Sequence, residues 1–173
     1  MDPARLERIF TDWHPLVWRT LRRLGLSPAE AADATRRVFQ DVARSRGRGL
    51  QRARERVVLL ELALRHAFGV DRHVVSEVRL RPPMARRPAA RSGIFARPRS
   101  PASTACVDLM DRVLSHMPRP QATAFILYEL EGLPIAEVGE VMSLGEEAAR
   151  QAVLHSRAEF KAIVAALRDG ARR

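Results

Sequence analysis

The sequence predicts an all-α fold in which two small helical domains, an N-terminal helical bundle and a C-terminal helix-turn-helix domain, are joined by a flexible linker. On both sides of the chain's middle, apolar residues recur with the 3.6-residue period of amphipathic helices. Between them, residues 78–105 combine five prolines with arginine, serine and alanine and show no period. We therefore expect domains at 1–77 and 106–173. The hydrophobic content of 46% in 173 residues permits a core in each.

The N-terminal domain is expected to contain three helices. Residues 3–24 predict an amphipathic helix that bends at Pro15. The second helix, to about residue 45, begins with a capping box formed by Ser27, Pro28 and Glu30. A third helix is expected over residues 53–76, and three such helices can close a small bundle.

Residues 131–160 outline two short helices joined by a tight turn, with the second helix running on. Gly132 closes a preceding helix, and Pro134 suits the first turn of the next one. Gly139 leaves room for another backbone, and the turn consists of Ser143, Leu144 and Gly145. This is the outline of a helix-turn-helix, so the first functional hypothesis is DNA binding.

The second helix of this motif separates a buried stripe from an outward face when its residues are placed at 100° intervals. The buried stripe consists of Ala149, Val153, Phe160, Val164 and Leu167. The outward side chains, which are the candidate base readers, are Arg150, Gln151 and His155.

The charge of the chain indicates a polyanionic partner. The formal net charge is +10 and the pI is near 11.4. Residues 1–77 carry fifteen arginines against ten acidic residues, and residues 78–105 carry seven arginines and no acid. Residues 106–173 carry eight basic and ten acidic residues, so the positive charge lies on the first half and the linker.

Several function classes are not indicated by the sequence. Cys106 is the only cysteine, so no intrachain disulfide is possible and a reducing, cytoplasmic location is expected. No apolar run is long enough for membrane insertion, and no signal-peptide core is visible. The chain also lacks a nucleophile beside a base, a phosphate-cradling glycine motif and a metal-spaced cluster. We therefore expect neither an enzyme nor a bound cofactor.

The C-terminal stretch resembles the fourth conserved region of extracytoplasmic-function (ECF) sigma factors, the small RNA polymerase subunits that recognise promoters. The family's Asp-Arg segment, Leu-Pro-like junction and Glu-Gly-Leu are matched by Asp111, Arg112, Met117, Pro118, Glu131, Gly132 and Leu133. Arg150, Gln151 and Arg157 fall on the basic and polar positions of the family's recognition helix. Ser143 stands where the family has glycine, which costs roughly 1 kcal/mol if the position is left-handed.

The N-terminal half resembles the second conserved region of the same family. The matching residues are His14, Pro15, Pro28, Ala29, Glu30, Ala31, Asp33, Val38 and Phe39. The resemblance implies that the second helix binds the coiled coil of the polymerase clamp. The candidate polymerase-binding residues are Asp33, Arg36, Arg37, Val38 and Phe39.

The segment after this helix corresponds to the family's DNA-melting segment. Where the family has aromatic residues, this chain has Ser45, Gln51 and Arg54. Weak promoter opening is therefore expected, because captured bases stack on aromatic surfaces. The segment remains strongly basic and suited to phosphate, and its candidate DNA-binding residues are Arg46, Arg48, Arg52 and Arg54.

Together these features predict a sigma factor-like protein that binds core RNA polymerase and directs it to promoter DNA. An anti-sigma factor is a further candidate partner. Two alternatives remain open. One is a sigma-like adaptor that docks on polymerase or an anti-sigma partner without melting DNA, and the other is a stand-alone helix-turn-helix regulator.

Overall fold

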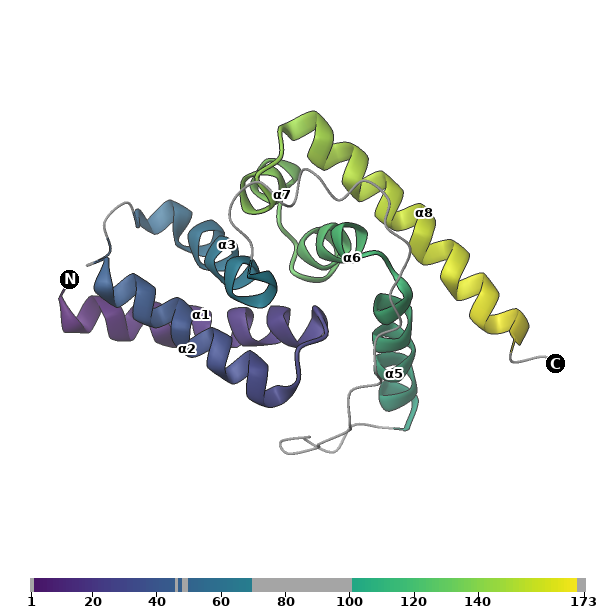
Figure 1. The fold of residues 1–173 in the computed structure, drawn as a ribbon, viewed down its shortest axis with the longest axis horizontal. Coiled ribbons are helices and arrows are strands. Elements are labelled where there is room, and N and C mark those ends of the chain that lie inside the picture. Colours follow the sequence, from purple (N-terminus) through teal and green to yellow (C-terminus); the bar gives the residue numbers. More distant parts are fainter. Residues whose placement is uncertain (1, 46, 48–49, 70–100, 171–173) are drawn as a thin grey trace.

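The computed structural model describes residues 2–45, 47, 50–69 and 101–170. These residues form helices and short connections, with no strand among them, which confirms the predicted all-α class (Figure 1). The N-terminal half contains the helices α1 (Pro3–Arg23), α2 (Pro28–Arg44) and α3 (Glu55–Phe68) and the short 3-10 helix η1 (Arg52–Arg54). The C-terminal half contains α5 (Pro101–His116), α6 (Arg119–Phe125), the π-helical turn η2 (Ile126–Leu130), α7 (Ile135–Met142) and α8 (Glu146–Gly170).

Local signals fix the ends of the N-terminal helices. The predicted capping box at the start of α2 is present: Glu30 N donates to Ser27 Oγ at 3.2 Å, and Ser27 N donates to Glu30 Oε2 at 2.8 Å. The hydrogen bonds from Ser27 lower the pKa of the Glu30 carboxyl. Pro15 lies inside α1. Gly69 closes α3 in the left-handed conformation with φ of 64°, so this helix ends before the expected residue 76.

The linker falls largely outside the described residues. Its C-terminal end does not, since α5 begins at Pro101, inside the stretch that the sequence assigned to the linker. The proline that suggested an extended chain sits at the first helical position, where its missing amide hydrogen costs nothing.

Two apolar cores hold the helices together. The first lies between α1, α2 and α3 and includes Ile9, Val17, Leu21, Val38 and Leu59. The second joins α5 to α8 and also contains four residues of the N-terminal half, namely Leu24, Val57, Leu60 and Leu64. Helix α3 therefore packs on α1 and α2 with one side and on α7 with the other (Figure 1).

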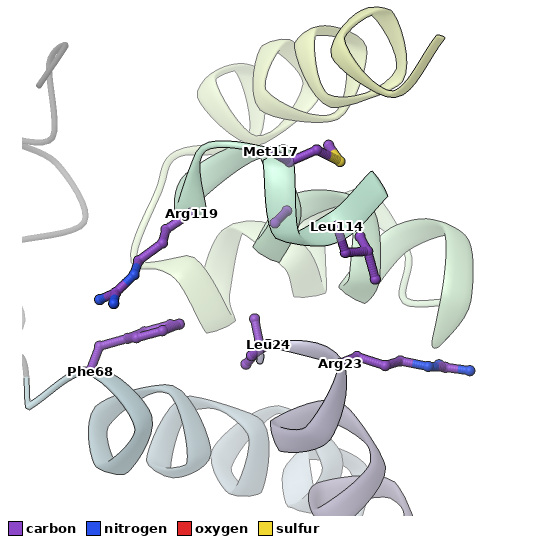
Figure 2. Close-up of a pocket in the computed structure, with 7 residues that line it drawn as sticks. Arg23, Leu24, Phe68, Leu114, Met117 and Arg119 are labelled. Carbon is purple, nitrogen blue, oxygen red and sulfur yellow. The ribbon is translucent and has the colours of Figure 1, made fainter. Parts of the chain in front are cut away.

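The contact between the halves continues at the C-terminal end of α3. The Arg119 guanidinium of α6 lies 5.2 Å from the centroid of the Phe68 ring. Figure 2 shows Leu24 facing Leu114 beside this pair. The division into domains at 1–77 and 106–173 stays a prediction, and the two halves share an apolar layer. Within the described part of the chain, no helix has the length and apolar character needed to cross a bilayer.

Candidate nucleic-acid and polymerase surfaces

The turn of the helix-turn-helix is built on a left-handed serine. Ser143 has φ of 56° and ψ of 39° and caps α7. Its amide nitrogen donates to the Glu140 carbonyl at 3.1 Å, and Leu144 N donates to the Gly139 carbonyl at 2.8 Å. A serine is costly at this position only if the backbone is left-handed. The backbone of Ser143 is left-handed, which is the conformation that favours glycine, so the expected cost applies.

A glycine sets the distance between α7 and α8. A Cβ atom added to Gly139 would lie 2.9 Å from the backbone oxygen of Leu144 and 3.4 Å from Ala149 Cβ. No side chain fits at position 139 unless the turn moves. This agrees with the prediction that another backbone approaches Gly139 closely. Val138, Met142 and Val153 are buried around this contact and hold the two helices at a fixed crossing.

The outward face of α8 carries the predicted readers. Arg150, Gln151 and His155 are exposed, and the stripe opposite them is buried at Ala149 and Val153. The first two are held by the acids at the start of the helix. Arg150 donates to Glu146 at 3.1 Å, and Gln151 donates to Glu147 at 3.0 Å. Leu154 lies between Gln151 and His155 in the sequence and is 50% exposed. It was not among the outward residues predicted from the sequence.

Arg157 has a different environment from the other predicted DNA-binding residues of α8. Its Nε lies 2.5 Å from Glu129, and its guanidinium lies 5.2 Å from the centroid of the Tyr128 ring. The hydrogen bond and the charge of Glu129 raise the pKa of Arg157 above its ordinary value. In this conformation Arg157 braces α8 against η2.

The basic segment before α3 is partly engaged with α7. Arg46 and Arg48 lie outside the described residues, and Arg52 is exposed. Arg54 forms an ion pair with Glu140 of α7 at 2.5 Å. Sequence reasoning named this arginine but could not name its partner, because 86 positions separate the two residues.

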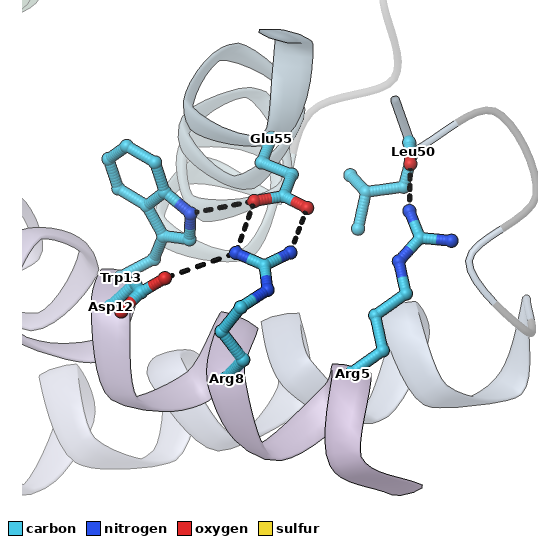
Figure 3. A network of polar contacts seen from close by, with 6 residues as sticks. All are labelled: Arg5, Arg8, Asp12, Trp13, Leu50 and Glu55. Atoms are coloured by element: carbon cyan, nitrogen blue, oxygen red, sulfur yellow. Dashed lines mark hydrogen bonds and ion pairs between the residues drawn. The ribbon is translucent and has the colours of Figure 1, made fainter. Parts of the chain in front are cut away.

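A buried carboxylate anchors the start of α3 (Figure 3). The Glu55 side chain is 1% exposed and accepts from both terminal nitrogens of Arg8, at 2.6 and 3.2 Å, and from Trp13 Nε1 at 3.2 Å. Burial opposes ionisation of this group, but the contacts with Arg8 and Trp13 outweigh it and lower the pKa of Glu55. Arg5 donates to the Leu50 carbonyl beside this network. The sequence pattern did not single out Glu55, which stands alone in a run of arginines.

The candidate polymerase-binding residues of α2 divide into an outer and an inner set. Asp33 and Arg36 form an ion pair at the surface, and Arg37 is exposed. Val38 is 0% exposed and Phe39 is 7% exposed, so both belong to the first core. The exposed surface of α2 is therefore polar, and Val38 and Phe39 lie beneath it in the core.

An aromatic stripe on α1, which the sequence reasoning missed as a surface, borders α2. Phe10 and Trp18 are 46% and 37% exposed. The Phe10 ring lies 4.7 Å from the His14 ring and 4.9 Å from the Phe39 ring, centroid to centroid. Phe10, His14 and Trp18 are spaced by four residues, which is the signal that could have placed them on one face.

The comparisons with known proteins agree with this geometry. Residues 108–160 match the family model described as sigma-70, region 4. This stretch contains α6, η2, α7, the turn and the first part of α8, so the match includes the whole helix-turn-helix motif. No curated protein matches the chain in sequence.

The fold as a whole is similar to that of CnrH, as seen in the structure of CnrH in complex with the cytosolic domain of CnrY. The similarity has a TM-score of 0.69 at 13% sequence identity and covers 95% of this chain and 90% of that chain. It therefore extends over both halves. The resemblance to sigma factors that the sequence indicates is confirmed.

Proposed function

We propose that this chain, whose C-terminal part is a sigma-70 region 4 domain, is an ECF-type sigma factor that binds core RNA polymerase and directs it to promoter DNA. The observation that carries the proposal is the α7–α8 motif, in which an exposed face bearing Arg150 and Gln151 stands over a buried stripe. Such a face fits the major groove, where arginine and glutamine read guanine and adenine edges. The α2 surface at Asp33, Arg36 and Arg37 contacts the polymerase.

In this function the chain acts in the cytoplasm through binding rather than catalysis. An anti-sigma factor is the proposed regulatory partner, in line with the complex of CnrH with the cytosolic domain of CnrY.

The test is transcription in vitro by core RNA polymerase on a library of candidate promoters, with and without the purified chain. The expected result is initiation from a subset of promoters only when the chain is present. Co-purification with core enzyme in low salt is the second measurement. If the chain neither associates with core enzyme nor changes initiation, both the sigma and the adaptor functions are wrong.

A second candidate function is an adaptor that docks on polymerase without opening DNA. It is favoured by the side chains in the melting segment, where Ser45, Gln51 and Arg54 offer no aromatic surface for a flipped base. Permanganate probing of unpaired thymines in the promoter complex separates the two functions. Reactivity at physiological salt identifies a sigma factor that opens DNA, and binding without reactivity identifies the adaptor.

A further inference from the structure

The outward face of α8 contains one large apolar side chain among its polar ones. Leu154 is 50% exposed, which is more than Phe10, Trp18 or Leu109, the other exposed large apolar residues of the described chain. Leu154 belongs to neither of the two apolar cores that the described residues form. A single exposed leucine is common in proteins, so its significance depends on where it lies on the helix.

Leu154 lies at the centre of the base-reading face that the sequence predicts. With the angular spacing of an α-helix, Leu154 is about 40° from Arg150 on one side and about 60° from Gln151 on the other, and His155 lies beyond Gln151. All four side chains are exposed. Figure 1 shows α8 at the outside of the C-terminal half, away from α1 and α2. A large ligand can therefore reach Leu154 together with the polar side chains beside it.

The polar neighbours of Leu154 are held toward the start of α8. Arg150 donates to Glu146 at 3.1 Å and lies 3.5 Å from Glu147, and Gln151 donates to Glu147 at 3.0 Å. These contacts draw both polar groups toward the turn that precedes them, whereas Leu154 lies on the turn that follows them. The face therefore has polar groups near its start and an apolar surface one turn later.

The base edges in the major groove offer a leucine one kind of favourable contact. Each base pair presents hydrogen-bond donors and acceptors there, and the apolar group among them is the C5-methyl of thymine. A leucine side chain placed against a polar edge displaces water without replacing the lost hydrogen bonds, which is unfavourable. A leucine placed against thymine buries a methyl group, which is favourable.

We propose that Leu154 is a specificity-determining residue that reads the C5-methyl group of a thymine in the duplex bound by α8. The inference deepens the proposed function and rests on its promoter contact, because it names a base that the same face selects. Leu154 has a role separate from that of Arg150, which would hydrogen-bond a guanine. The preference is for thymine over uracil, because the two bases differ only in this methyl group.

The test removes the methyl group from the DNA and the leucine side chain from the protein. Duplexes are selected from a random library by the full-length chain, alone and with core RNA polymerase, and the enriched duplex is the probe. Each of its thymines is replaced by uracil in turn, and fluorescence anisotropy measures affinity. The variant is Leu154→Ala. The matched control is Leu109→Ala, which shortens an exposed leucine of α5, outside the face of α8.

We expect uracil at one position to weaken binding of the unmutated chain and of Leu109→Ala by about fourfold, which corresponds to burial of one methyl group. The thymine and uracil duplexes should bind equally well to Leu154→Ala. The Tm of this variant should match that of the unmutated chain, because Leu154 packs in neither core. Selection repeated with Leu154→Ala should lose the thymine at that position and keep the rest of the site.

The inference is overturned if no uracil substitution weakens binding, or if uracil weakens binding of Leu154→Ala as much as that of the unmutated chain. In the second case, a loss of affinity shared by both duplexes would place Leu154 against a protein surface instead. If the thymine preference holds while the chain neither associates with core polymerase nor changes initiation, only the proposed function is wrong. If the chain directs initiation and no uracil effect is found, only the role of Leu154 is wrong.

Discussion

Two left-handed positions of the C-terminal half, one occupied by serine and one by glycine, should respond to substitution in opposite ways. Glycine in place of the serine should raise the free energy of unfolding, and serine in place of the glycine should lower it. Ser143 and Gly132 have φ of 56° and 67°. A left-handed backbone costs a non-glycine residue about 1 to 2 kcal/mol, and the freedom that glycine adds to the unfolded chain offsets roughly 0.5 kcal/mol of any gain. Ser143 is exposed, so its side chain packs against no core residue. We therefore expect Ser143→Gly to stabilise the chain by about 1 kcal/mol, which raises Tm by about 2 to 4 °C.

The matched variant is Gly132→Ser. A Cβ atom at Gly132 would have no atom within 4 Å, so its effect is confined to the backbone. It should lower the free energy of unfolding by about 1 kcal/mol, and the double variant should be close to the unmutated chain. Thermal and urea unfolding followed by circular dichroism measure all three. If Ser143→Gly leaves Tm unchanged or lowers it while Gly132→Ser is destabilising, the account of the turn is wrong.

Three further predictions concern the buried glycine, the buried acid and the recognition face. Gly139→Ala should destabilise the chain by roughly 1 to 3 kcal/mol in urea, because the added carbon meets backbone; an unchanged midpoint would contradict this packing. Glu55→Gln should cost about 1.5 to 3 kcal/mol at neutral pH, because it weakens the charged hydrogen bonds with Arg8, which is partly exposed. Because the pKa of Glu55 is lowered from 4.5, its contribution is present above that value and lost as the pH falls below it, so the variant should differ less from the unmutated chain in acid. Arg150→Ala should weaken promoter footprints by about 1 to 3 kcal/mol without changing Tm; an intact footprint would place base readout elsewhere on α8.

Local patterns predicted the helices and much of the recognition motif. The 3.6-residue period and the small residue at 139 are properties of neighbouring positions, and the structure places Gly139, Ala149 and Arg150 as they indicate. The same period placed Val38 and Phe39 on the apolar side of α2, whereas the family resemblance implied that they bind the polymerase. Their burial follows the period.

Pairings between distant residues were beyond the sequence. Arg56 of α3 donates to Glu137 of α7 at 3.0 and 2.6 Å, although the two are 81 positions apart and neither belongs to a periodic pattern that points to the other. The Glu131 side chain is 0% exposed and accepts from Arg19 and Arg23 of α1, whereas the sequence shows it only as part of a Glu-Gly-Leu motif. Its partners on α1 become visible once the shared apolar layer brings the halves together.

In the proposed function, the lack of aromatic residues bears on one step of initiation. The arginines of the melting segment can hold a strand's backbone but cannot stack a base, so they strengthen binding of a strand more than they strengthen opening. Polymerase docking on α2 would then have to supply what the melting segment lacks.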